Sequence, residues 1–216
     1  MSRRVRRTQA ERRLESEHAL LQAAIDVIVS EGMAGVTFEA LGRAGGFSRG
    51  LASTRFGSKA GLIEAVLKNL HERQQAMLEE HGFDDLPGLD AVLGYVGTCL
   101  RDMAHNKEAQ AYFMLLSSSV AETNELRTAF AATHEVVRQR LEGWIEKGQA
   151  EGTIRREEKA GALALMVGCL MFGMSMQLLV DPRVDFEALR RSSLALLRQS
   201  LAATTTDDRK GARAQS

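Results

Sequence analysis

The stretch VTFEALGRAGGFSRGLASTRFGSKAG, residues 36–61, contains two short helical segments joined at a pair of glycines. Thr37 stands where its hydroxyl oxygen can cap the first segment, and Ser48 stands where it can cap the second. The pair Gly45-Gly46 lies between them, and glycine adopts the positive φ angles of a tight turn at no steric cost. The pattern therefore predicts a helix-turn-helix over residues 37–56.

The second helix of this pair has the residues of a DNA-contacting helix. Arg49 and Gly50 lie in its first turn, from which side chains reach base edges and backbone N–H groups meet phosphates. An arginine can match the O6 and N7 acceptors of guanine with two hydrogen bonds. Leu51 or Ala52, together with Phe56, is expected to anchor the helix inward.

A third helix is expected to begin after Gly57, with Ser58 as its cap. Lys59 lies in its first turn, where a cation opposes the helix dipole. A phosphate partner explains this lysine better than helix stability does. The residues expected to contact DNA are Thr37, Ser48, Arg49, Gly50, Ser53, Thr54, Arg55 and Lys59.

Charge is unevenly distributed along the chain. The formal net charge is zero, yet residues 1–60 hold ten basic and six acidic side chains. Residues 1–13 carry six arginines and one glutamate. Such an arm can lie on phosphates or enter a minor groove, although a solvated tail has the same composition. We assign residues 1–15 to a basic flexible arm.

The rest of the chain is expected to be all-α, because it holds only two prolines and little alternation of the strand type. Apolar spacing predicts one helix from near Ser16 to Gly32 and another from Lys59 to about Glu80. The segment HGFDDLPGLD, residues 81–90, is typical of a connection. Later helices are expected at about 88–104, 107–121, 124–150, 156–180 and 185–203.

No residue pattern points to catalysis, a cofactor or a metal. The five histidines have no metal-ligand spacing, and neither a phosphate-binding glycine loop nor a nucleophile elbow is present. Cys99 and Cys169 lie in apolar surroundings, where cysteine behaves as a small buried hydrophobe, so a reduced, cytoplasmic setting is expected.

The segment at residues 162–180 (ALALMVGCLMFGMSMQLLV) has no charged residue over 19 positions. That length can span a bilayer, but a helix that is apolar all round can also lie in a protein core or a subunit interface. We favour a subunit interface, in which the helices near 156–180 and 185–203 of two copies make a four-helix homodimer contact. A membrane anchor is the less favoured alternative.

Residues 18–67 resemble the N-terminal domain of the tetracycline-repressor (TetR) family of bacterial transcription regulators. The resemblance rests on ALLQAAIDVIVSEGMAGVTFEALGRAGGFSRGLASTRFGSKAGLIEAVL, in which the caps, the glycine turn and FGSK fall where the family pattern puts them. One departure concerns the second helix: Ser53 and Thr54 stand where the family often has aromatic residues. Arg55 is expected to replace some of the lost affinity by its charge.

The resemblance implies an all-α homodimer that binds double-stranded DNA and a small-molecule effector. It implies a DNA-binding domain, placed at residues 16–80 with the start of the connecting helix, and an effector-binding and dimerisation domain at 81–203. Residues 204–216 are expected to form a disordered tail. Methionine and aromatic residues suit an adaptable apolar pocket. The residues chosen as its lining are Tyr95, Cys99, Met103, Phe113, Met114, Trp144 and Phe172.

The sequence thus predicts a ligand-responsive repressor that binds a palindromic operator as a dimer, with half-sites about 34 Å or a multiple of that apart. A different class stays open: a helical ligand-binding or interaction protein whose helix-turn-helix is only structural.

Overall fold

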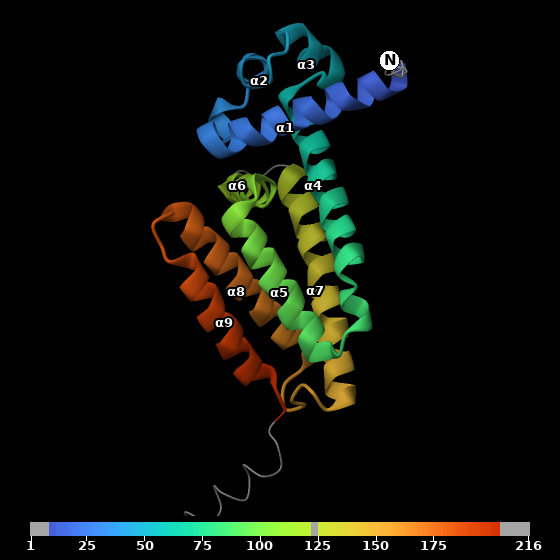
Figure 1. Ribbon diagram of the computed structural model, residues 1–216, viewed down its shortest axis with the longest axis vertical. Coiled ribbons are helices and arrows are strands. Elements are labelled where there is room, and N and C mark those ends of the chain that lie inside the picture. Colours follow the sequence, from blue (N-terminus) through green and yellow to red (C-terminus); the bar gives the residue numbers. More distant parts are fainter. Residues whose placement is uncertain (1–8, 122–124, 204–216) are drawn as a thin grey trace, which may run out of the picture. The chain divides into compact units, whose positions relative to one another are not determined.

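The computed structural model describes residues 9–121 and 125–203, and these residues form an all-α fold without a strand longer than one bridge pair (Figure 1). This confirms the predicted fold class. The elements are α1 (Gln9–Gly35), α2 (Phe38–Gly45), α3 (Arg49–Phe56), α4 (Lys59–His81), the short 3₁₀ helix η1 (Phe83–Asp85), α5 (Gly88–His105), α6 (Lys107–Ala121), α7 (Glu125–Glu151), α8 (Ala160–Val180) and α9 (Phe186–Leu201).

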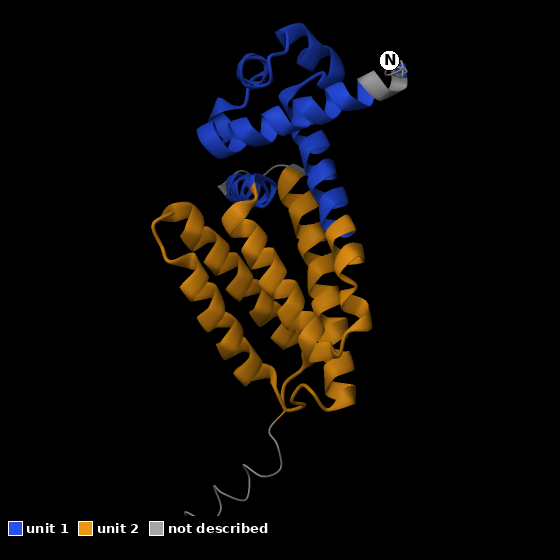
Figure 2. Ribbon diagram, viewed as in Figure 1, with its two compact units in different colours: residues 1–75, 107–121 blue, residues 76–106, 122–216 orange. Residues whose placement is uncertain are grey.

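The chain divides into two compact units (Figure 2). Unit 1 comprises the described residues up to Gln75 together with residues 107–121. Unit 2 comprises residues 76–106 and the described residues from 125 onward. Helix α6 therefore packs with the N-terminal helices, although its sequence neighbours α5 and α7 both belong to unit 2.

Helix α1 begins earlier than the sequence pattern predicted. It starts at Gln9, so residues 9–15 are helical, and their assignment to a flexible arm was wrong. Residues 1–8 of that arm lie outside the described residues, as do residues 204–216 of the expected tail. Gly32 does interrupt the helix as expected, because its φ of 69° and ψ of −177° break the helical path, but one more turn follows to Gly35.

Unit 1 is held together by the apolar face of α1, which packs against α2 and α6. Ala24, Ile25 and Ile28 are fully buried on this face, as the helical spacing predicted. The start of α6 is fixed by two ion pairs: Lys107 with Asp26 of α1 (2.6 Å), and Glu108 with Arg73 of α4 (2.7 Å). These two pairs span 81 and 35 residues of sequence, respectively.

Unit 2 is a bundle centred on α5, which packs against α7, α8 and α9. Phe83, Tyr95 and Trp144 form an aromatic cluster in its core, with ring centroids 5.4–6.0 Å apart. The indole N–H of Trp144 donates to Asp84 (2.7 Å), so the one polar group of that side chain is satisfied. The cluster thereby connects η1, α5 and α7.

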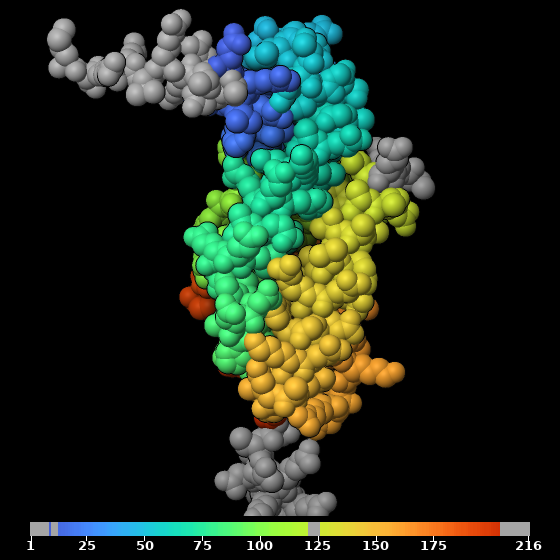
Figure 3. Space-filling view, turned by 90° about the vertical axis from the view of Figure 1, so that its right-hand side faces the viewer, coloured from blue at the N-terminus to red at the C-terminus, as the bar shows by residue number. Residues whose placement is uncertain are grey.

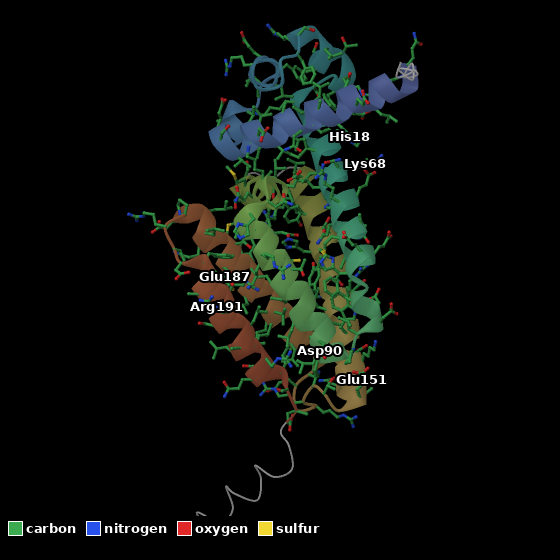
Figure 4. All side chains as sticks on the ribbon, in the orientation of Figure 1. His18, Lys68, Asp90, Glu151, Glu187 and Arg191 are labelled. Carbon is green, nitrogen blue, oxygen red and sulfur yellow. The ribbon has the colours of Figure 1, made fainter. Side chains whose placement is uncertain are left out.

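Polar contacts close one end of unit 2, where Asp90 and Glu151 lie (Figure 4). The Glu151 carboxylate accepts a hydrogen bond from the backbone N–H of Gly88 (2.8 Å), one of the N–H groups at the α5 N-terminus that lack a partner within the helix. Asp90 of α5 pairs with Arg198 of α9 (3.3 Å).

One face of α8 carries exposed apolar side chains. Leu165 is 59% exposed, and the other members recur at helical spacing. We call this set the α8 stripe: Ala162, Leu165, Met166, Cys169, Phe172, Gly173 and Val180. On the side of unit 2 seen in Figure 3, α7 forms most of the surface and α8 is largely hidden.

The opposite face of α8 is buried in unit 2 through Leu163, Val167 and Met174. By length and composition the helix could cross a membrane, and it is the one such helix among the described residues. The expectation that Cys169 is buried was wrong for the single chain, where this cysteine is exposed.

Candidate nucleic-acid interface

The turn between α2 and α3 depends on two glycines with different functions. Gly46 ends α2 in the left-handed region, with φ of 70° and ψ of 24°, where a Cβ would be strained. At Gly42 the constraint is space, because an added Cβ would come within 2.7 Å of the Phe47 carbonyl oxygen. The Phe47 N–H donates to the Gly42 carbonyl (3.1 Å), which closes the turn.

Hydroxyl caps begin each helix of this region, as the sequence predicted. The Thr37 oxygen accepts from the Ala40 N–H (3.0 Å), and the Ser48 oxygen accepts from the Leu51 N–H (3.3 Å). The Ser58 oxygen caps α4 in the same way, accepting from the Gly61 N–H (3.1 Å). These caps use hydroxyl lone pairs, so the hydroxyl hydrogens of Thr37 and Ser48 can still be donated to a phosphate oxygen.

Ala52 is the inward anchor of α3, since its side chain is completely buried while Phe56 is half-buried. The outward face comprises Arg49, Gly50 and Thr54, with Leu51 beside them. Neither the Arg49 guanidinium nor the Thr54 hydroxyl bonds to another side chain or backbone group within the described part of the chain. The first turn of α3 therefore presents a cation without an internal partner.

Gly50 differs from the two turn glycines. It lies inside α3 with an ordinary negative φ, and an added Cβ would meet no atom within 4 Å. Nothing in the fold of the described residues requires a glycine here, and glycine in a helix costs roughly 0.5–1 kcal/mol relative to alanine. A partner that approaches the backbone closely would require it.

Two of the predicted cationic contact residues already bind acceptors within the protein. Arg55 pairs with Glu17 of α1, and both side chains are mostly buried, at 27% and 28% exposure. Lys59 donates to the Met33 carbonyl at the end of α1 (2.6 Å). That carbonyl is the negative partner of Lys59 in the free protein, in place of the expected phosphate. Sequence reasoning missed both contacts, because the partners are 38 and 26 residues away.

Ser53 lies half-buried on α3, and its hydroxyl donates to the Gly50 carbonyl one turn earlier (3.3 Å). Its hydrogen is therefore used within the helix, unlike that of the exposed Thr54. The eight residues predicted to contact DNA thus lie together on α2, α3 and the start of α4. They differ in how much of each side chain is left for a partner.

Residues 20–66, which extend from α1 into α4, match the sequence model of bacterial regulatory proteins of the tetR family. Over these residues the chain is similar to the tetR family. The predicted resemblance over residues 18–67 is thereby confirmed. No curated protein sequence matches the chain.

Solved structures extend the likeness to the whole fold of this chain. A putative TetR-family transcriptional regulator from Rhodococcus sp. is 25% identical, with a TM-score of 0.74, over 86% of this chain and 97% of its own. NalD, the secondary repressor of the MexAB-OprM multidrug efflux pump in Pseudomonas aeruginosa, is 18% identical, with a TM-score of 0.67, over 88% and 96%. A putative regulator from Saccharomonospora viridis, in complex with choline, is 18% identical, with a TM-score of 0.73, over 88% and 100%.

The residues chosen as an effector pocket lie in three different places. Tyr95, Cys99, Met103 and Trp144 are in unit 2, where Tyr95 and Trp144 share the aromatic cluster and Cys99 packs against the core. Burial raises the pKa of the Cys99 thiol to about 12. Phe113 and Met114 lie on α6 in unit 1, and Phe172 lies on the α8 stripe. The seven residues therefore do not form one contiguous set within either unit.

Proposed function

We propose that this protein is a tetR-family repressor that binds a palindromic DNA operator as a homodimer and is released by a small, largely apolar effector. The observation that carries the proposal is the first turn of α3, where Arg49 has no internal partner and Gly50 leaves the backbone uncovered. The hydroxyl caps and the Ala52 anchor hold that turn in place. The protein would act in the cytoplasm, where bacterial operators are.

In this proposal Arg49 contacts a guanine edge in the major groove. The hydroxyls of Thr37, Ser48 and Thr54 donate to phosphates, and phosphate contacts set the register on the duplex. Gly50 lets a sugar-phosphate strand approach the helix. We assign Arg55, which Glu17 already binds, to holding α3 against α1; Ser53 and Lys59 contribute mainly within the protein.

The α8 stripe is the proposed centre of the dimer interface. It is an exposed apolar face, and patches of this kind on soluble proteins mark interaction sites. At Gly168 and Gly173 an added Cβ would meet nothing within 4 Å, so both glycines leave space for a second helix. We expect Leu196, which is exposed on α9, to take part in the same interface. Phe172 fits this interface better than a pocket, because it belongs to the stripe.

The effector would bind in unit 2 near the aromatic cluster, where Tyr95 and Trp144 offer flat apolar faces. Choline is bound by the Saccharomonospora regulator, which supports a small-molecule site on this fold but does not identify the ligand here. Helix α6 offers a route to the DNA-binding helices: its chain neighbours α5 and α7 belong to unit 2, while Lys107 and Glu108 attach it to α1 and α4.

The test is a binding titration of the purified protein against its own promoter region and against random duplex of equal length. We expect nanomolar-range binding to one promoter fragment, with a steep loss of affinity as salt rises. Arg49→Ala should lose about 1–3 kcal/mol for that fragment and little for random DNA. Arg101→Ala, which removes an exposed arginine from α5 in unit 2, is the matched control and should change neither affinity.

A second candidate is a helical ligand-binding or interaction protein whose helix-turn-helix is only structural. It is favoured by one observation: Thr37, Ser48, Arg55 and Lys59 all make bonds within the protein. Equal affinity for promoter and random DNA at moderate salt, unchanged by Arg49→Ala, would support this candidate and reject the repressor.

A further inference from the structure

Leu51 is an apolar side chain that the fold leaves outward on a DNA-facing helix. Its neighbour Ala52 takes the buried position of α3, and Leu51 itself is 42% exposed. The sequence allowed either residue to be the anchor. Only one of them is, and the isobutyl group of the other points away from the core of unit 1.

The residues next to Leu51 indicate which kind of partner could contact its side chain. It is the third residue of α3, directly after Arg49 and Gly50, in the turn that presents the unpartnered guanidinium. At Gly50 there is no side chain to stand between this turn and a partner. An apolar group beside an arginine in the first turn of a recognition helix lies where base edges are contacted.

In the major groove, the C5 methyl of thymine is the one apolar group that a base edge presents. We propose that Leu51 packs against the C5 methyl of a thymine in each half-site of the operator, and so specifies an A·T pair beside the base pair contacted by Arg49. This inference rests on the proposed operator binding. It adds apolar recognition to a helix whose sequence suggested only polar contacts.

The expected loss of DNA affinity follows from the burial of one thymine methyl group in each half-site. Removing it from each contact should weaken binding about fourfold per half-site, or roughly fifteenfold for both half-sites of a dimer. A solvent-exposed leucine with no contact to DNA would give no change.

The experiment replaces thymines of the operator, one symmetry-related pair at a time, by deoxyuridine. Deoxyuridine pairs with adenine as thymine does but has no C5 methyl. We expect one thymine pair at which the replacement weakens wild-type binding about fifteenfold. Leu51→Ala should bind the thymine operator equally weakly and should be insensitive to the replacement at that pair. Leu51→Met, which keeps an apolar side chain, should retain the sensitivity.

Two control variants separate Leu51 from its surroundings. Thr54→Ala removes the other methyl-bearing side chain of the outward face and should keep the deoxyuridine effect. Val120→Ala shortens an exposed apolar residue on α6 of the same unit and should behave as wild type.

Four results would overturn the inference. If no thymine replacement changes wild-type affinity, or if Leu51→Ala responds to each replacement as wild type does, Leu51 contacts no thymine methyl although the operator is bound. If Thr54→Ala abolishes the effect instead, Thr54 makes the contact. If the wild-type protein prefers no promoter fragment over random DNA, the proposed function itself fails, and the inference fails with it.

Discussion

The first turn of α3 and the outer face of α8 are both surfaces that the packing of a single chain leaves open, yet they are opposite in chemistry. The α3 turn presents the Arg49 cation, the Leu51 side chain and a glycine with open space around it, and the Thr54 hydroxyl follows one turn later. The α8 stripe presents leucine, methionine, phenylalanine and valine over five turns without a charge. The α3 turn suits DNA, which combines charged phosphates with base edges of different hydrogen-bonding pattern. The α8 stripe suits an apolar protein partner.

The difference also shows in how each helix is attached to its unit. Helix α3 has eight residues and one fully buried side chain, so its position depends on caps, turn glycines and the Arg55–Glu17 pair. Helix α8 has twenty-one residues and is buried along its inner face by aliphatic side chains. A surface for DNA can thus be built on a short helix fixed by polar contacts, whereas a surface for a second copy is built on a long helix fixed by its own core.

The largest effect should come from a charge placed on the α8 stripe. Leu165→Glu would bury one carboxylate in each half of a two-fold interface, at a cost of about 4 kcal/mol, or roughly a thousandfold in dimer dissociation constant. Sedimentation velocity should show a dimer for wild type and a monomer for the variant at micromolar concentration. Val136→Glu, the same kind of change at an exposed position of α7, should leave the dimer intact.

A monomeric wild-type protein, or a dimer unaffected by Leu165→Glu, would remove the stripe from the interface. A wild-type protein that stays with lipid and needs detergent for solubility would instead favour the membrane alternative for α8.

The two cysteines give a second measurement of the same surface. Cys169 lies on the stripe, so a dimer should shield it from a thiol reagent, and Leu165→Glu should increase its reaction rate about a hundredfold. Cys99 should stay inert in both proteins, because burial raises the pKa of its thiol to about 12 and leaves little reactive thiolate at pH 8. Cys169→Ala assigns the signal. Fast labelling of Cys169 in a protein that sediments as a dimer would place the interface elsewhere.

Local chemistry explains which parts of the fold could be predicted from the sequence. The helix at residues 107–121 was predicted at its observed bounds, and the caps at Thr37 and Ser48 were predicted because each bonds to an N–H only three residues away. The early start of α1 was missed because its first two turns are rich in charge and have no apolar stripe to detect.

The contacts that could not be predicted are those between distant residues. In the sequence Arg55 has no acidic partner nearby, but the fold places Glu17 of α1 against it. Lys59 opposes the dipole of its own helix, but the fold places the Met33 carbonyl at the end of α1 within hydrogen-bond distance. The packing of α6 in unit 1 likewise depends on Asp26 and Arg73, which no local pattern connects to residues 107 and 108. The sequence could not decide whether Leu51 or Ala52 is the buried anchor. A small rotation of a short helix about its axis decides which of two adjacent apolar residues faces the core.

On α3, Gly50→Ala should have opposite effects on the stability of the free protein and on its affinity for the operator. The added methyl has space in the free protein, so the free energy of unfolding should rise by about 0.4–1 kcal/mol. The same methyl would stand between the helix and a DNA strand, and we expect operator affinity to fall about tenfold. Gly143→Ala, at an exposed glycine of α7 that also has open space, should stabilise the protein without changing DNA binding. Unchanged operator affinity in Gly50→Ala would mean that no close approach occurs there.

The smallest loss of operator affinity is expected for Arg55→Ala. This variant tests whether Arg55 contacts DNA or holds α3 against α1. If Glu17 and Arg55 hold α3 against α1, Arg55→Ala and Glu17→Ala should each destabilise the protein by about 0.5–1 kcal/mol, and the double variant should lose little more than either alone. Operator affinity should then fall less than about fivefold, with an unchanged dependence on salt. If Arg55 contacts a phosphate, Arg55→Ala should instead make the slope of log affinity against log salt shallower by about 0.9 for each half-site, whereas Glu17→Ala should leave the slope intact. Because Glu17 already neutralises Arg55 within the protein, we expect the unchanged slope, with Arg49 the main cation on the outward face of α3.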